Sequence, residues 1–215
     1  MHQQIINNFL EIKKSLKDFS QNICIIAVSK TFDIDHIKPL IDYGHNHYGE
    51  NKVQEAKTKW TNKKKENPNI KLHLVGKLQT NKVKYVVGLF DYVHSLDSLK
   101  LASKLSEEEK KKGIKLKYFI QINIGDESQK SGIKLNELEK FYSECTKELN
   151  LDIVGLMCIP PNDNSSNLYF SKMNELKKKI NLKELSMGMS ADYIEAIKNG
   201  STFIRVGSKI FGERT

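Results

Sequence analysis

Cysteine is scarce in this sequence, with three residues in 215. Cys24, Cys145 and Cys158 are odd in number, far apart and without CxxC spacing. Disulfide-stapled folds carry a dense, even set of cysteines, and zinc sites use closely spaced pairs. The pattern therefore argues against both. Cys24 and Cys158 fall in apolar runs and are expected to be packing residues.

Long apolar runs are absent as well. No segment approaches the roughly 18 apolar residues that a membrane-spanning helix needs. The first residues lack the charged region and apolar stretch of a signal peptide. We therefore expect a cytoplasmic protein with no membrane partner.

Arginine is the rarest charged residue: Arg205 and Arg214 are the only two among 35 lysines and arginines. The formal net charge of +9 raises the possibility of nucleic-acid binding. However, the lysine runs at 63–65, 110–112 and 177–179 are mixed with glutamates and lack interleaved aromatic residues. We interpret them as solvated helix faces and expect no nucleic-acid partner. An arginine in so lysine-rich a chain indicates a need for a planar, permanently charged group.

Hydrophobic periodicity predicts alternating strands and helices after an opening amphipathic helix at 2–19. The predicted strands are 23–29, 47–50, 72–76, 92–95, 116–124, 153–159, 184–187 and 203–206. The predicted helices between them are 33–43, 53–67, 80–89, 98–112, 135–149, 168–180 and 191–199. Such alternation favours parallel strands with right-handed crossovers. We predict an α/β fold, a single (β/α)8 TIM barrel over residues 1–215 with an extra N-terminal helix (1–20) packed on it; a doubly wound open sheet is the alternative.

Lys30 directly follows the apolar run 24–29, at the end of a predicted buried strand. Burial lowers the pKa of a lysine, and a lysine with a partly neutral amine can attack a carbonyl to form a Schiff base. The alternative is a strand-end lysine whose amine reaches water along its aliphatic stem.

Two glycine- and serine-containing loops follow the last two predicted strands. Gly188 and Ser190 lie in the first loop, and Gly207 and Ser208 lie in the second, with Arg205 on the strand between them. Such loops expose backbone N–H groups and hydroxyls to an anion, and TIM barrels commonly bind phosphate after strands seven and eight. Each serine taken alone could instead be a simple helix cap, and Ser190 could cap the helix that follows it while its hydroxyl faces an anion.

Several motifs occur together and in a characteristic order. They are Ala27-Val-Ser-Lys30, Tyr48-Gly-Glu-Asn-Lys-Val-Gln54, His73-Leu-Val-Gly-Lys-Leu-Gln-Thr-Asn-Lys82, Gly155-Leu-Met157, Ser186-Met-Gly-Met-Ser-Ala-Asp192, Gly200-Ser-Thr202 and Phe211-Gly-Glu-Arg214. With these motifs the chain resembles, over nearly its whole length, the YggS/PROSC family of pyridoxal phosphate homeostasis proteins.

The resemblance implies a barrel of the alanine racemase type that holds pyridoxal 5'-phosphate (PLP). Lys30 would carry the cofactor as a Schiff base, and Arg205 would face the pyridine nitrogen. The implied phosphate ligands are Ser190, Gly207 and Ser208, and the implied pocket residues are Asn51 and Met187. The sequence departs from the family pattern in an extra residue in the loop at 123–132 and in Ser208, where threonine is frequent.

The resemblance implies a protein that stores, buffers or delivers PLP without robust turnover, with PLP-dependent apo-enzymes as candidate recipients. An arginine beside the pyridine nitrogen disfavours its protonation and weakens the ring as an electron sink. A PLP-dependent amino-acid racemase is the alternative, but it needs a second acid/base group. The candidates for such a group, His45, His47, Tyr48 and His73, are expected to be packing or loop residues. We also expect a monomer, because no apolar stripe marks the outer helices.

Overall fold

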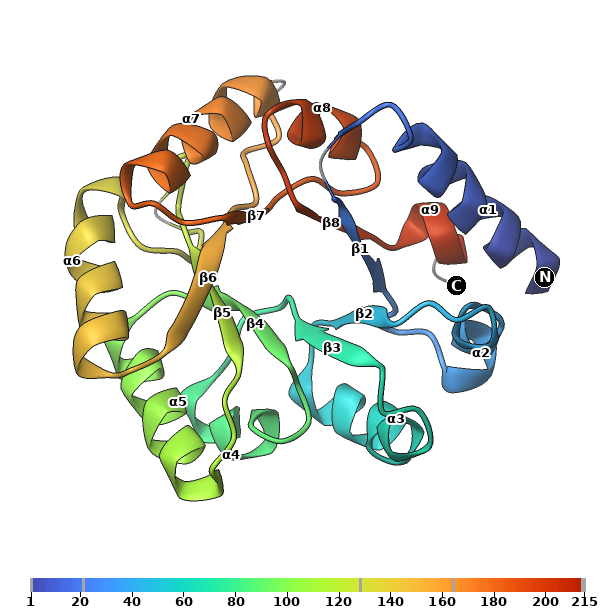
Figure 1. The fold of residues 1–215 in the computed structure, drawn as a ribbon, viewed down its shortest axis with the longest axis horizontal. Coiled ribbons are helices and arrows are strands. Elements are labelled where there is room, and N and C mark those ends of the chain that lie inside the picture. Colours follow the sequence, from blue (N-terminus) through green and yellow to red (C-terminus); the bar gives the residue numbers. More distant parts are fainter. Residues whose placement is uncertain (1, 21, 128, 164, 214–215) are drawn as a thin grey trace.

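The strands of the protein form a closed parallel barrel in the order in which they occur along the chain (Figure 1). The computed structural model describes residues 2–20, 22–127, 129–163 and 165–213. The strands are β1 (Cys24–Val28), β2 (His47–Glu50), β3 (Lys71–Leu74), β4 (Tyr92–Leu96), β5 (Lys117–Gln121), β6 (Asp152–Met157), β7 (Glu184–Ser186) and β8 (Phe203–Val206). β8 pairs with β1, with Cys24 opposite Phe203 and Ala27 opposite Val206, and this pairing closes the barrel. The predicted TIM barrel is confirmed, and the open-sheet alternative is wrong.

Helices surround the barrel on the outside (Figure 1). The α-helices are α1 (His2–Ser15), α2 (Ile34–Asp42), α3 (Val53–Glu66), α4 (Val83–Val86), α5 (Leu99–Lys112), α6 (Leu138–Ser143), α7 (Ser166–Lys179), α8 (Tyr193–Lys198) and α9 (Ser208–Phe211). Short 3-10 turns, η1 (Thr80–Lys82) and η2 (Leu135–Glu137), precede α4 and α6, and a π-helical turn, η3 (Glu144–Glu148), extends α6.

The structure differs from the predicted elements in several places. The predicted helix 80–89 ends at Val86, because Val87 is extended and Gly88 has a φ of +99°. The predicted strand 116–124 ends at Gln121, because Ile122 leaves β5 to form a bridge with Ile133. The short helix α9 was not predicted, since four residues are too few for a periodic pattern.

Helix α1 packs against the outside of the barrel beside α9, as Figure 1 shows. Its buried residues Ile5, Phe9 and Ile12 lie on one face at helical spacing. The side-chain amide of Asn8 donates a hydrogen bond of 3.0 Å to the carbonyl oxygen of Ile210 in α9. The predicted N-terminal helix is therefore present, although it ends at Ser15 rather than at residue 19.

Buried side chains fill two layers of the molecule. A large apolar cluster lies between the strands and the helices, and a small one, Ile26, Val28, Phe119, Met157 and Phe203, fills the barrel interior. This arrangement follows from alternation along each strand, which sends successive side chains inward and outward. Among the described residues, no helix is long and apolar enough to cross a membrane.

Candidate functional site

Lys30 lies directly after β1, at the C-terminal end of the barrel strands, and is half-buried. The preceding residue, Ser29, is fully buried, and its backbone N–H donates to the carbonyl oxygen of Gly49 at 2.9 Å. The Ser29 hydroxyl donates to Oε1 of Glu50 at 2.8 Å. These bonds fix the chain where Lys30 begins, at the end of a TIM barrel that carries active sites.

Thr31, the residue after Lys30, has a left-handed backbone with a φ of +72°. This conformation is unfavourable for a β-branched residue. The Thr31 backbone N–H donates to Oε1 of Glu55 at 2.6 Å, and this bond holds the bend. The chain therefore turns sharply at Lys30, at a local conformational cost that often marks a functional site.

A buried carboxylate, that of Glu50, stabilises this turn through hydrogen bonds. Glu50 is fully buried, and its Oε1 accepts hydrogen bonds from Lys59 Nζ and from Trp60 Nε1, both at 2.9 Å. Lys59 Nζ also donates to the carbonyl oxygen of Ser29 at 2.8 Å and to Glu55 at 3.0 Å. Burial raises the pKa of Glu50, against the opposing effect of the Lys59 charge. This network ties α3 to both residues that flank Lys30.

Arg205 points from β8 into the barrel interior and is nearly fully buried. Its Nη1 donates to the carbonyl oxygen of Ser186 at 2.6 Å and to the Ser186 hydroxyl at 2.7 Å, and its Nη2 donates to the carbonyl oxygen of Cys158 at 2.9 Å. A guanidinium has five N–H donors. The contacts recorded within the described residues use three, so the edge formed by Nε–H and one Nη2–H remains for a ligand.

The loops after β7 and β8 meet at the same mouth of the barrel. The Ser208 hydroxyl donates to the Ser190 hydroxyl at 3.2 Å, which joins the two predicted anion loops. A side-chain carbon at Gly207 would lie 3.1 Å from the carbonyl oxygen of Val28, a tight contact, so this loop lies close to β1. The alternative that Ser190 is a helix cap is wrong, because α8 begins at Tyr193 and Asp192 occupies its N-cap position. The Ser190 hydroxyl is therefore not engaged in capping.

The two remaining predicted site residues are placed differently from each other. Asn51 directly follows β2 and is half-buried, and a side-chain carbon at Gly76 would lie 2.4 Å from its carbonyl oxygen. The Met187 side chain is fully buried in the large cluster between strands and helices, outside the barrel interior. Any contact between Met187 and a ligand would therefore come from its backbone. Arg214 lies outside the described residues.

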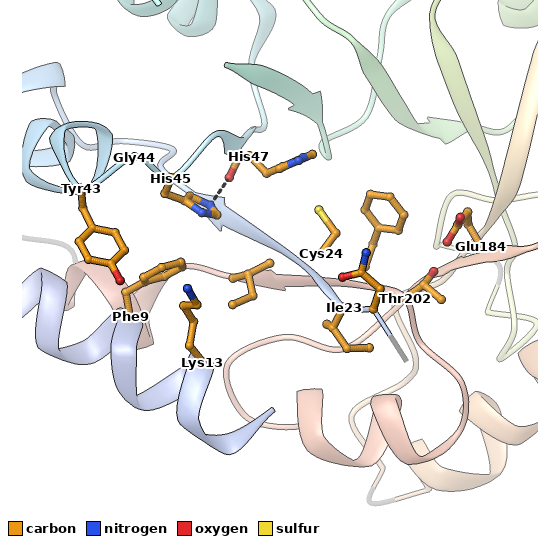
Figure 2. Close-up of a pocket in the computed structure, with 13 residues that line it drawn as sticks. Phe9, Lys13, Ile23, Cys24, Tyr43, Gly44, His45, His47, Glu184 and Thr202 are labelled. Carbon is orange, nitrogen blue, oxygen red and sulfur yellow. Dashed lines mark hydrogen bonds between the residues drawn. The ribbon is translucent and has the colours of Figure 1, made fainter. Parts of the chain in front are cut away.

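The four candidate acid/base residues do not lie at the Lys30 end of the barrel. His45 and His47 lie at the opposite mouth, where they line a cavity of about 460 Å³ (Figure 2). Burial lowers the pKa of His45 to about 4. The Tyr48 ring is fully buried against Trp60, with ring centroids 4.8 Å apart, and His73 is fully buried within the barrel. The described residues contain no cluster of three metal-ligating side chains.

Sequence analysis missed the partners that hold Arg205. Ser186 and the carbonyl of Cys158 bind its guanidinium, and His94 Nδ1 lies 2.9 Å from the Ser186 hydroxyl. His94 and Ser186 are 92 residues apart in the chain, and no local pattern pairs them. Side chains alternate between inward and outward positions along β4 and β7, and this alternation is the one sequence signal that could have placed His94 and Ser186 in the barrel interior.

Comparisons with known proteins agree with this architecture. Residues 2–215 match the model of the family "Alanine racemase, N-terminal domain". A protein of Aquifex aeolicus named "Pyridoxal phosphate homeostasis protein" is 38% identical over 200 residues, which cover 88% of this chain and 86% of that protein. The PipY protein of Synechococcus elongatus PCC7942, solved without and with PLP bound, is 32% identical; 97% of this chain aligns with the whole of PipY at TM-scores of 0.88 and 0.87.

A more distant likeness concerns the fold alone. Alanine racemase from Clostridium difficile 630 is 17% identical, with a TM-score of 0.78 over 99% of this chain and 57% of the racemase. At this identity, the match shows a shared barrel and carries no argument about activity.

Proposed function

Because the chain belongs to the family of pyridoxal phosphate homeostasis proteins, we propose that it binds PLP on Lys30 and serves in PLP homeostasis without robust catalytic turnover. The observation that carries this proposal is the juxtaposition, at one mouth of the barrel, of a half-buried lysine, two serine loops in contact and an arginine with an unused donor edge. PLP, when bound, supplies an aldehyde that condenses with an amine with loss of water.

Lys30 is the proposed attachment point. Its neighbours are fixed on both sides, Ser29 by Glu50 and Thr31 by Glu55. A fixed backbone holds the base of the Lys30 side chain in one place, which favours a covalent bond between its amine and an aldehyde held nearby. The resulting Schiff base leaves the cofactor reversibly bound, because water can reverse the condensation.

Arg205 is the proposed partner of the pyridine nitrogen. A guanidinium cannot accept a proton, so it can only donate a hydrogen bond to that nitrogen. The positive charge beside the ring then opposes protonation of the nitrogen. A ring that stays unprotonated withdraws electrons weakly, as expected of a carrier.

The loops after β7 and β8 are the proposed phosphate site. Ser190 and Ser208 supply hydroxyl groups from the two loops, and the backbone at Gly207 and Ser208 supplies N–H groups. Asn51 and the backbone of Met187 complete the proposed pocket.

The absence of robust turnover is supported by the position of the acid/base candidates. His45 and His47 lie at the opposite mouth, and Tyr48 and His73 are fully buried behind other side chains. A racemase needs an acid/base group on each face of the substrate's α-carbon, one to remove the proton and one to return it. The racemase alternative would require such a group from a source other than these four residues.

Equilibrium binding tests the cofactor assignment. Titration with PLP, followed by visible absorbance, should show saturable binding to the wild type and to Lys100→Ala, an exposed lysine on α5. Lys30→Ala should lose the Schiff-base absorbance. Equal absorbance in Lys30→Ala and the wild type would refute Lys30 as the attachment point.

Proton exchange separates the carrier from the racemase. Amino acids incubated with the PLP-loaded protein in deuterated water should keep their α-proton over many hours. Rapid exchange that requires Lys30 would show turnover and favour the racemase. We extend the proposal to a cytoplasmic monomer that passes PLP to apo-enzymes.

A further inference from the structure

A line of hydrogen-bonded side chains crosses the barrel interior from one mouth to the other. His47 Nδ1 lies 3.0 Å from His73 Nε2, and His73 Nδ1 lies 2.9 Å from His94 Nε2. His94 Nδ1 lies 2.9 Å from the Ser186 hydroxyl, to which Arg205 Nη1 donates at 2.7 Å. We call His47, His73, His94 and Ser186 the imidazole chain.

Flanking rings hold the imidazoles in place. The His73 ring stacks on Tyr92 with centroids 4.3 Å apart and an interplanar angle of 10°. The His94 ring stacks on Phe119 with centroids 4.3 Å apart and an angle of 15°. Each ring is therefore confined to the plane in which both of its nitrogens have a partner.

The direction of the hydrogen bonds follows from Arg205. Its guanidinium only donates, so the Ser186 oxygen accepts and the Ser186 proton needs an acceptor. Among the recorded contacts of that hydroxyl within the described residues, His94 Nδ1 is the one able to accept. His94 then donates from Nε2 to His73, and His73 donates from Nε2 to His47. Each of the three imidazoles is thereby specified as the Nε2–H tautomer.

The interior of the chain is neutral. Burial lowers the pKa of His73 and of His94 well below the usual histidine value, and the Arg205 charge lowers that of His94 further. His47 is half-buried and lines the cavity in Figure 2. Burial and the Lys71 charge lower the pKa of His47, and Asp91 opposes them. The other titratable groups that face the cavity or the His47 ring are Lys13, Cys24, Tyr43, His45, His73 and Glu184.

A proton on His47 conflicts with this direction. Protonated His47 carries N–H groups at both nitrogens, so Nδ1 can no longer accept from His73. Either that bond breaks inside the barrel, or His73 and His94 both switch to the Nδ1–H tautomer, which reverses the direction of all three hydrogen bonds. After reversal, both His94 and Arg205 donate to Ser186, and the Ser186 proton loses its acceptor. Both outcomes carry the cost of a buried unpaired polar group.

We propose that Ser186 and His94 are positioning residues for Arg205, and that His73 and His47 continue this line of hydrogen bonds to the opposite mouth. A proton on His47 disturbs the hydrogen bonds that position Arg205, so a proton on His47 and a ligand on Arg205 disfavour each other. The direction of the chain is a property of the protein alone. The coupling to a ligand rests on the proposed PLP site.

The direction is tested first, in the wild type without PLP. Imidazole ¹⁵N chemical shifts at neutral pH distinguish the two neutral tautomers. The proposal requires His47, His73 and His94 all to be Nε2–H. An Nδ1–H form at any of the three, or a mixture, would overturn it, and this result does not depend on whether PLP binds.

The link between the two mouths is tested with Ser186→Ala. Without the Ser186 hydroxyl, His94 Nδ1 has no partner whether it accepts or donates. Reversal of the hydrogen bonds along the imidazole chain then adds no further cost. The pKa of His47 should therefore rise by about one pH unit, equivalent to roughly 1.4 kcal/mol. The control is Ser106→Ala, which removes a buried hydroxyl that donates to Leu149 at 2.6 Å, outside the imidazole chain. An equal His47 pKa in both variants would overturn the proposal.

Coupling to the ligand is tested by PLP affinity at pH 7.5 and at a pH below the His47 pKa. Lowering the pH should raise the dissociation constant of the wild type by about fivefold more than that of Ser186→Ala, a factor at the low end of coupling between distinct sites. The comparison between variants cancels the titration of PLP itself. Equal pH dependence of the dissociation constant in the two proteins would refute the coupling. No PLP binding at any pH would refute the proposed function, but the tautomer result would be unaffected.

Discussion

At the scale of single residues, Arg205 carries the most specific arrangement in the molecule. Three of its N–H groups bind the carbonyl of Cys158 and two oxygens of Ser186. Arg205→Lys keeps a charge but cannot reach all three acceptors with one ammonium. We expect a loss of about 1–3 kcal/mol in the free energy of unfolding, measured by urea denaturation, because a buried acceptor is left unpaired. A variant as stable as the wild type would contradict the three-bond arrangement.

Lys59 is the second residue that decides local stability, because it neutralises a fully buried carboxylate. Lys59→Met leaves Glu50 without its cation, and we expect urea denaturation at neutral pH to show a loss of about 3 kcal/mol. The control, Lys63→Met on the same helix, removes an ion pair with the exposed Glu66 and should change little. Adding Glu50→Gln to Lys59→Met should restore part of the loss. If the double variant were no more stable than Lys59→Met alone, the buried charge of Glu50 would not be the cause of the loss.

At the scale of elements, the turn between β1 and α2 holds Lys30 in a costly conformation. Thr31→Asn keeps the backbone bond to Glu55 and replaces a β-branched residue by one that tolerates a positive φ. We expect the thermal midpoint to rise, by an amount equivalent to about 1 kcal/mol. Thr58→Asn, on an exposed position of α3, should have almost no effect, because the two residues have similar helix propensities. Equal effects at both positions would contradict strain at Thr31.

The same scale shows what the sequence could predict. The alternation of apolar runs and helix-like segments was sufficient to predict the barrel and the approximate bounds of most helices and strands. It failed where backbone conformation decides: Gly88 shortens the helix at 80–89, and Asp192 rather than Ser190 occupies the N-cap position of α8. The bonds among His94, Ser186 and Arg205 join β4 to β7 and β8, and their register appears only in the folded barrel.

At the scale of the whole molecule, buried neutral histidines make the fold sensitive to acid. The pKa of His45, His73 and His94 is lowered by burial, so the unfolded chain binds protons that the folded one does not. Their contribution to stability is complete above the unfolded pKa of about 6.5 and is lost as the pH falls toward the folded pKa. Each should remove about 1.4 kcal/mol per pH unit below that value.

Urea denaturation at pH 7.5 and pH 5.5 measures this dependence. His73→Gln should lower stability at pH 7.5 but flatten the pH dependence, because one proton fewer is taken up on unfolding. His2→Gln, on the exposed face of α1, should leave the dependence unchanged. A His73→Gln variant with the full wild-type pH dependence would show that His73 is not held neutral.

The most direct test of the central claim is to find which lysine PLP occupies. The wild type, incubated with PLP and reduced with borohydride, would be digested and its peptides mapped by mass spectrometry, with Lys30→Ala treated in parallel. We predict a single predominant adduct on Lys30 that is missing from the variant. Adducts spread over surface lysines to the same extent in both proteins would contradict the account.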